Sequence, residues 1–248
     1  MQPPVPTQPQ IADTPAAEPS PAPTDPEESA APPPVYSTRL PPPVSLQYSV
    51  RRGLASGVAE LQWQSAEGRY QVRLHSQIAG KPAVGWASQG NLDAAGIAPG
   101  RYTESRRGRE LRAANFQREA GRISFSGPTL EYPLVEGAQD RLSWMIQLGA
   151  VLAANPDLAE TGSQVSLFVA GTRGDARTWV FTVLGQEPLQ LPDGTLTTTV
   201  HLHREPARPY DTQVDVWLDP ARHHLPARMH LRTRGGGEGL EFELQDLR

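Results

Sequence analysis

Apolar and polar residues alternate along most of the chain, and the clearest example is the stretch 211–234. Every second residue is apolar from Val214 to Leu218, and again from Leu225 to Leu231. Because successive side chains of a strand point to opposite faces, this period of two predicts two half-buried strands. Asp219-Pro220 between them is typical of a turn, since Asp bonds its own backbone and Pro presets φ. The stretch is therefore predicted to be a β-hairpin.

The same alternation recurs before and after this hairpin. Turns are predicted at Glu67-Gly68, Arg107-Gly108 and Asp193-Gly194, and around Ala95-Gly96 and Pro99-Gly100. Short connections without intervening helices favour antiparallel pairing. The predicted fold class is mainly β: a single large curved antiparallel sheet, as a half-barrel or open barrel, with one amphipathic helix packed on or in it. The strands are expected near 44–51, 59–63, 69–78, 84–91, 101–107, 110–117, 123–125, 164–170, 178–184, 195–203, 212–218, 225–234 and 240–246.

One segment, about 140–154, has helical rather than strand spacing. Asp140 is the expected N-cap, and Asn155-Pro156 is expected to end the helix. The sheet is the only apolar partner available to the stripe, so we expect the helix to bury it there. The stripe consists of Leu142, Met145, Ile146, Leu148, Gly149 and Leu152.

The first 43 residues have a different composition from the rest. They hold 15 of the 26 prolines, with five acidic residues against one base, Arg39. Such a segment has too little apolar surface to fold, and its prolines favour an extended chain. We predict a disordered, acidic, Pro-rich spacer over 1–43 and a β domain over 44–248. A docking ligand for an aromatic groove and a dispensable terminus are the alternatives for the spacer.

The remaining 205 residues are formally neutral, with 22 acidic and 22 basic side chains. A neutral body has no basic stripe for a phosphate backbone, so no nucleic-acid partner is expected. Without cysteine there are no disulfides and no thiol chemistry. No apolar run is long enough for a membrane span in this chain, and no signal peptide is visible after Met1.

Candidate chemistry is sparse. His201 and His203 leave the same face of a strand, as in some metal sites, but no third ligand at fixed spacing accompanies them. His223-His224 lies in the predicted turn without partners that would make either a general base. No G-x-S-x-G occurs, and Gly235-Gly236-Gly237 lacks the setting of a phosphate loop. We therefore predict no enzyme, no catalytic residue, no metal and no cofactor.

Two further features concern surfaces. A cationic row of Arg228, His230, Arg232 and Arg234 faces Glu241 and Glu243 of the next strand, so cross-strand ion pairs are expected, with an anion-binding face as the alternative. Among the five tryptophans, Trp217 alone falls on the polar face of its strand. It is a candidate for a cavity wall or a partner surface.

Two motifs resemble a known family. Val216-Trp217-Leu218-Asp219-Pro220-Ala221-Arg222, followed by Leu225-Pro226-Ala227-Arg228, is similar to domain-of-unknown-function family 3108, and so is Asp140-Arg141-Leu142-Ser143. The strand–Asp-Pro–strand–Leu-Pro hairpin is also similar to periplasmic lipoprotein-carrier half-barrels, whose helices close an apolar cavity. The resemblance implies an exported envelope protein with an N-terminal anchor, and it brings no active-site residues.

Together these features predict a non-enzymatic periplasmic protein, tethered by an anchor absent from this chain. Its expected ligand is a lipid or acyl chain bound in the β scaffold. The predicted ligand-binding residues are Trp144, Ile146, Leu148 and Trp217. The alternative is a protein–protein interaction module of the cell envelope, with an envelope protein as its partner and no small-molecule ligand.

Overall fold

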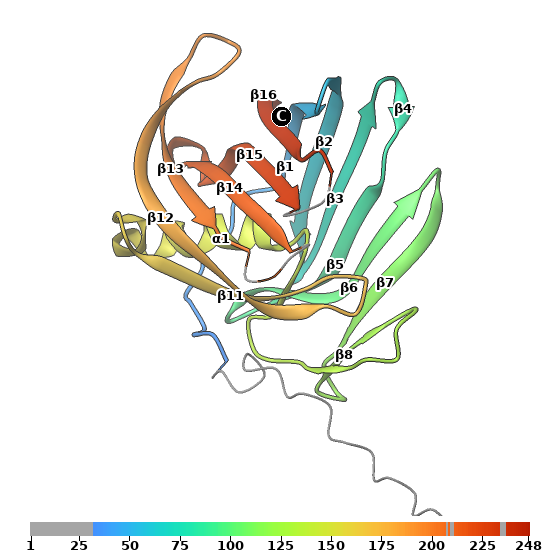
Figure 1. The fold of residues 1–248 in the computed structure, drawn as a ribbon. Coiled ribbons are helices and arrows are strands. Elements are labelled where there is room, and N and C mark those ends of the chain that lie inside the picture. Colours follow the sequence, from blue (N-terminus) through green and yellow to red (C-terminus); the bar gives the residue numbers. More distant parts are fainter. Residues whose placement is uncertain (1–31, 207, 209–210, 234–236) are drawn as a thin grey trace, which may run out of the picture. The chain divides into compact units, whose positions relative to one another are not determined.

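A computed structural model describes residues 32–206, 208, 211–233 and 237–248. They form one sheet of 16 strands, almost entirely antiparallel, that does not close (Figure 1). The predicted fold class is confirmed. The strands are β1 (Val44–Arg52), β2 (Ala55–Ala66), β3 (Arg69–Ile78), β4 (Lys81–Pro82), β5 (Gly85–Asp93), β6 (Gly96–Arg106), β7 (Arg109–Gln117), β8 (Arg122–Phe125), β9 (Tyr132–Pro133), β10 (Gln139–Asp140), β11 (Gln164–Ala170), β12 (Ala176–Gln190), β13 (Leu196–Arg204), β14 (Thr212–Asp219), β15 (Leu225–Thr233) and β16 (Leu240–Leu247).

Strand order in the sheet follows the chain, but it does not begin at β1. The strands run from β10 to β16, then continue from β1 to β9, with β4 paired to β3 outside this path. The join is the antiparallel pair of β16 with β1, in which Phe242 lies opposite Val50. The two edges, β9 and β10, are consecutive in the sequence. Among the described strands, only β10 and β11 pair in parallel.

The predicted turns are mostly confirmed. Glu67-Gly68 and Arg107-Gly108 adopt positive φ in two-residue hairpins, and Asp193-Gly194 lies in the β12–β13 connection. The expected turn at Pro99-Gly100 is wrong, because both residues lie inside β6. Pro99 is tolerated there opposite Gly90, where a bulge interrupts the β5–β6 register.

The hairpin that the alternation predicted over 211–234 is β14 and β15. Its turn contains a short 3-10 helix, η3 (Pro220–Arg222), and the buried Asp219 carboxylate accepts a hydrogen bond from Ala221 N at 2.9 Å. The same carboxylate contacts the Arg222 guanidinium at 2.5 Å and accepts from Thr197 Oγ1 at 3.0 Å. Asp219 therefore ties the turn to β13 as well as closing it.

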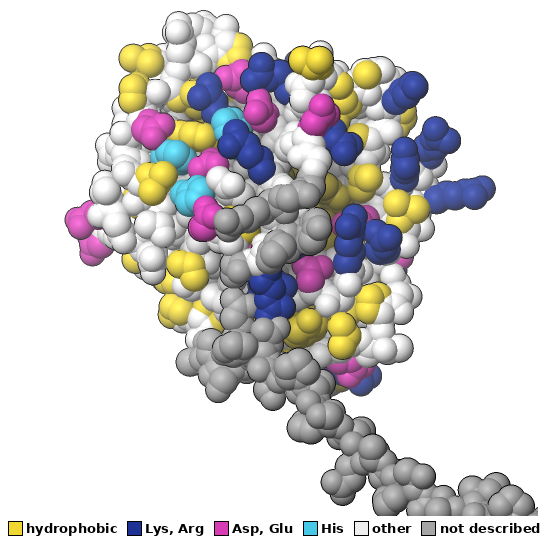
Figure 2. Space-filling view, viewed as in Figure 1, with side chains coloured by type: hydrophobic (Ala, Val, Ile, Leu, Met, Phe, Trp, Pro, Cys, Tyr) yellow, Lys and Arg dark blue, Asp and Glu magenta, His cyan; other side chains and the backbone are white. Residues whose placement is uncertain are grey.

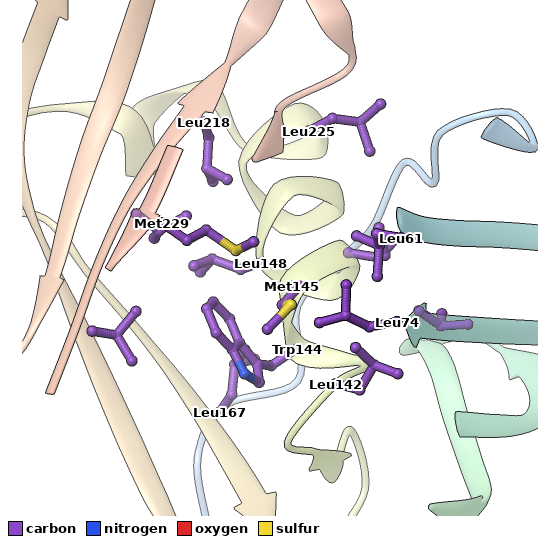
Figure 3. Packing of buried hydrophobic residues seen from close by; sticks show 14 of the residues in the cluster. Leu61, Leu74, Leu142, Trp144, Met145, Leu148, Leu167, Leu218, Leu225 and Met229 are labelled. Atoms are coloured by element: carbon purple, nitrogen blue, oxygen red, sulfur yellow. The ribbon is translucent and has the colours of Figure 1, made fainter. Parts of the chain in front are cut away.

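The α-helix, α1 (Trp144–Ala154), is buried on every side from Trp144 to Leu152. The predicted stripe was therefore only part of its contact surface, and the polar face expected of an amphipathic helix is absent over these residues. Gln147 occupies the remaining face, where its amide accepts from Ile97 N at 2.9 Å and donates to Ala95 O at 2.6 Å. Figure 3 shows apolar side chains from both halves of the sheet converging on the helix.

The helix begins later than predicted. Asp140 caps the turn that precedes α1, since its Oδ1 accepts hydrogen bonds from Leu142 N and Ser143 N, both at 2.8 Å. Ser143 Oγ in turn accepts a hydrogen bond from Asp140 N at 2.9 Å, so the pair has the reciprocal geometry of a capping box. The helix ends before Asn155 as expected, and a second 3-10 turn, η2 (Pro156–Ala159), follows.

Residues 32–43 contact the β domain, although the predicted boundary assigns them to the spacer. Arg39 N donates to Ala150 O at 2.9 Å, and Tyr36 OH accepts from Ser166 N at 3.0 Å. Trp63 Nε1 donates to Pro41 O at 3.0 Å. Residues 1–31 of the predicted spacer lie outside the described residues.

Candidate functional site

A cavity of about 650 Å³ lies on the concave side of the sheet, beside the first turn of α1. Its apolar wall is contributed by strands from both halves of the chain and by the helix. Because β1 and β16 join the two halves, residues far apart in sequence meet there. The apolar lining includes Ile78, Trp86, Tyr102, Trp144, Trp179, Leu231, Leu240 and Phe242.

Two tryptophans of this wall, Trp144 and Trp179, pack with Phe181 in an aromatic group. Trp144, from α1, lies 5.2 Å from Phe181 and 5.9 Å from Trp179 between ring centroids. Both partners come from β12, where alternate side chains face the same side of the sheet. All three rings are buried, so the aromatic group belongs to the core as well as to the wall.

Charged side chains form the rim of the cavity. Arg141 contacts Asp175 at 2.5 Å and donates to Thr212 Oγ1 at 2.8 Å. The buried Arg204 contacts Asp211 at 2.5 Å and lies over the Trp179 ring, 4.2 Å from its centroid. The charged residues that line the cavity are Arg52, Glu104, Arg141, Arg173, Asp175, Arg177, Arg208, Asp211 and Glu238.

Burial shapes the electrostatics of this rim. It lowers the pKa of Arg204, although the hydrogen bond to Asp211 opposes that change. For Asp211, burial alone would raise the carboxyl pKa, but Arg204 and Arg177 lower it below its ordinary value. The cavity thus combines an aromatic wall with a charged mouth.

The four predicted ligand-binding residues do not share one site. Trp144 lines the cavity. Ile146 and Leu148 are buried in the core around α1, and Figure 3 shows Leu148 there. Trp217 lies on the opposite face of its strand from the buried Val216, where it stacks on a histidine ring and donates from Nε1 to Glu187 Oε2 at 2.8 Å.

The two histidines weighed as metal ligands belong to this outer-face cluster. Asp215 Oδ1 lies 2.8 Å from His203 Nδ1 and 3.3 Å from His201 Nε2, and His201 Nδ1 lies 2.8 Å from Glu187 Oε1. Figure 2 shows histidine and acidic side chains gathered on one face of the molecule. Within the described ranges, no group of three or more His, Cys, Asp or Glu side chains is arranged to hold a metal ion.

The predicted cross-strand ion pairs are confirmed on β15 and β16. Arg228 contacts Glu243 at 2.7 Å, and Arg232 lies 3.9 Å from Glu241. Arg234 and the glycines at 235 and 236 lie outside the described residues. Of the helices in the described part of the chain, none is long and apolar enough to cross a membrane.

Several cavity residues were not singled out from the sequence. Trp179 was not among the predicted ligand-binding residues, and neither was any residue of the turn that carries Thr172 and Asp175. A charged turn followed by Arg177 and Trp179 on alternate positions of a strand was the available signal. This signal could not identify the other residues of the cavity wall, because Trp86 and Phe242 lie on strands that are distant in the sequence.

The molecule is thus an open antiparallel sheet with a helix buried against its concave face and a cavity at the start of that helix. The family model described as Protein of unknown function (DUF3108) matches residues 47–245, and the chain belongs to this family. The predicted resemblance is confirmed. No curated protein matches the sequence.

Solved structures with similar folds have low sequence identity. A β-barrel-like protein of domain of unknown function DUF1849 from Brucella abortus is 14% identical, with a TM-score of 0.55 over 86% of this chain and 99% of that one. MucB in its complex with MucA from Pseudomonas aeruginosa is 14% identical, with a TM-score of 0.35. That match covers 83% of this chain and 51% of the MucB chain. A putative outer membrane lipoprotein-sorting protein domain from Vibrio parahaemolyticus is 11% identical, with a TM-score of 0.29 over 84% and 85% of the two chains.

Proposed function

We propose that this protein binds an apolar ligand, such as a lipid or an acyl chain, in the cavity beside α1. The observation that carries the proposal is the cavity itself, with about 650 Å³ of space against an aromatic wall. Ligand sites in proteins commonly enclose about 300–1,000 Å³, are mostly apolar, and carry a few polar groups that orient the ligand. The cavity lies in this volume range and has an aromatic wall, and its rim carries more charged groups than such sites usually have.

Each predicted site residue has a distinct place in this proposal. Trp144 contacts the ligand, while Ile146 and Leu148 fix the helix that carries it. Trp217 lies outside the cavity and has no ligand contact. Charged groups at the mouth are engaged in ion pairs such as Arg141–Asp175, which suits a non-enzymatic binding role.

We further propose a location in the periplasm, where the Pro-rich segment would hold the domain away from an anchor. This location follows from the exported character implied by the family resemblance and from the composition of residues 1–43. Sheet-edge docking of a partner protein is less well supported, because the edge strands β9 and β10 are each only two residues long.

Native mass spectrometry of the full chain, purified from a bacterial periplasm, tests the binding role when lipid extraction accompanies it. We expect a stoichiometric added mass that is recovered as lipid. Trp86→Ala removes part of the half-buried cavity wall, and it should lower the fraction of the protein that carries the added mass. Trp217→Ala is the matched control, because it removes a tryptophan from the outer face and should leave the bound mass unchanged.

A bare polypeptide mass, in preparations that also fail to take up added fatty acid, contradicts the lipid role. Crosslinking in the periplasm would then test the protein-interaction alternative.

A further inference from the structure

Two buried polar atoms at the cavity have no hydrogen-bond partner. They are the Thr172 hydroxyl and Nη1 of Arg177, and both residues line the cavity. Thr172 is only 1% exposed. Buried donors are nearly always satisfied in folded proteins, and leaving one unpaired is unfavourable. These two groups therefore have unused capacity to donate hydrogen bonds at the same rim.

Their elements fix where they point. Thr172 lies in the turn between β11 and β12, which is closed by a 2.8 Å bond from Gly171 N to Asp175 O. Arg177 precedes Trp179 by two residues on β12, so both side chains leave the same face of the sheet. Arg177 is thereby placed beside the aromatic wall. Its side chain is 21% exposed, whereas its unpaired Nη1 is itself buried, so a head group must enter the rim to contact that atom.

Arg177 has the weakest ion pair of three neighbouring arginines. Three guanidinium groups, from Arg141, Arg177 and Arg204, share two carboxylates. Arg141 forms an ion pair with Asp175 at 2.5 Å, and Arg204 forms one with Asp211 at 2.5 Å. Arg177 lies 3.7 Å from the same Asp211 oxygen, beyond hydrogen-bonding distance. One positive charge is therefore left without a hydrogen-bonded counter-ion, and it belongs to the residue with the unpaired donor.

We propose that Arg177 and Thr172 form an oxyanion-binding subsite that takes the carboxylate or phosphate head group of an amphiphile. The apolar chain of that amphiphile lies against Trp144 and Trp179. Arg177 supplies charge and a directed N–H donor, and Thr172 supplies an O–H donor. This inference rests on the proposed function and specifies its ligand class as an anionic, not a neutral, amphiphile.

A pair of probes with the same chain and different head groups tests this subsite. ω-Bromododecanoic acid and ω-bromododecanol both carry a heavy atom that quenches tryptophan fluorescence, so titration of the full-length protein yields a dissociation constant for each. The acid should bind at least about tenfold more tightly than the alcohol, as expected for charge-assisted hydrogen bonds. Inorganic phosphate, added alone and as a competitor, distinguishes a free anion from a lipid head group.

Variants locate the preference. Arg177→Gln should reduce the ratio of acid to alcohol affinity to about one and leave the affinity for the alcohol unchanged. Thr172→Val should reduce the same ratio partly. Arg122→Gln is the control, because it also removes one positive charge but lies in an exposed ion pair with Glu131 outside the cavity. Unchanged alcohol binding demonstrates that the cavity of each variant is intact.

The outcomes separate the two proposals. Equal affinity for acid and alcohol in the wild type overturns the oxyanion subsite and leaves apolar binding standing. An acid preference that persists in Arg177→Gln overturns the assignment to these residues. Binding of phosphate without either amphiphile supports the subsite and contradicts the acyl-chain role. Absence of binding by all three probes contradicts both.

Discussion

Gly149 provides the sharpest test of how α1 is held in the sheet. A Cβ atom at this position would lie 2.3 Å from the carbonyl oxygen of His224 and 3.1 Å from its carbonyl carbon. The nearer distance is about 1 Å shorter than ordinary van der Waals contact, which begins near 3.4 Å. Because the contact is with backbone, no side-chain rotation can relieve it. In Gly149→Ala the helix and the β14–β15 turn must move apart.

The expected cost follows from two opposing effects. Alanine is favoured over glycine in a helix interior by about 1 kcal/mol. Overpacking of a well-packed core costs about 1–3 kcal/mol, occasionally more. The cost belongs at the upper end of that range here, because α1 is buried on every side and the turn residues His223 and His224 already hold positive φ. We therefore expect a net loss of about 2 kcal/mol in the free energy of unfolding.

Urea denaturation followed by tryptophan fluorescence measures this loss. Gly127→Ala is the matched control, because a Cβ there meets no atom within 4 Å and the residue does not hold a positive φ. It should be neutral or slightly stabilising through the unfolded state. If Gly149→Ala is as stable as the wild type, the close approach of α1 to the hairpin is wrong.

Three further predictions concern buried polar groups. Burial raises the pKa of Asp140 from 3.8 to about 6, so its contribution to stability is present below pH 4 and lost as the pH rises through about 6. In urea denaturation, the unfolding free energy of the wild type relative to that of Asp140→Asn should therefore fall by about 1.4 kcal/mol per pH unit between pH 4 and 6. Parallel pH profiles of the two proteins would refute this. Asp215→Asn should lower the pKa of His201 in an NMR titration, because burial alone lowers that pKa and carboxylate contacts, including Asp215, raise it above its ordinary value; an unchanged His201 pKa would exclude the contact. Tyr48→Phe should cost about 1–2 kcal/mol in urea denaturation by leaving the buried Pro226 carbonyl without its 2.7 Å hydrogen bond, and a neutral result would contradict that accounting.

The sequence alone was sufficient for much of the sheet. In β14 and β15 the apolar residues from Val214 to Met229 are buried as the alternation predicts, but near the turn Trp217, Asp219 and Pro226 of the other face are buried as well. The pairing of β1 with β16 was not predictable in this way. Alternation identifies which face is buried but carries no information about which strand is the neighbour. The turn at Pro99-Gly100 was predicted wrongly because the interrupted register at Gly90 allows a proline inside the strand.

The site was less accessible to sequence reasoning for a different reason. The burial of Gln147 depends on Ile97 N of β6 and on Ala95 O of the preceding turn, which satisfy its amide. A polar residue in a helical pattern otherwise indicates a solvent-exposed position. The cavity exists only where α1, β5, β12 and β16 meet. Trp144 was identified because a tryptophan within the predicted helix is conspicuous, whereas Thr172 becomes informative only when its unpaired hydroxyl is seen.

The join between β16 and β1 has a consequence for how the chain could be rewired. Both open edges of the sheet flank a single short loop, at 134–138, while the strands nearest the two ends of this sequence pair in its middle. A circular permutant cut in that loop, with Val44 linked to Leu247, would place every consecutive strand beside its predecessor. Its contact order would be lower, because the β1–β16 pairing would become a local hairpin, and it should fold faster than the natural arrangement at similar stability.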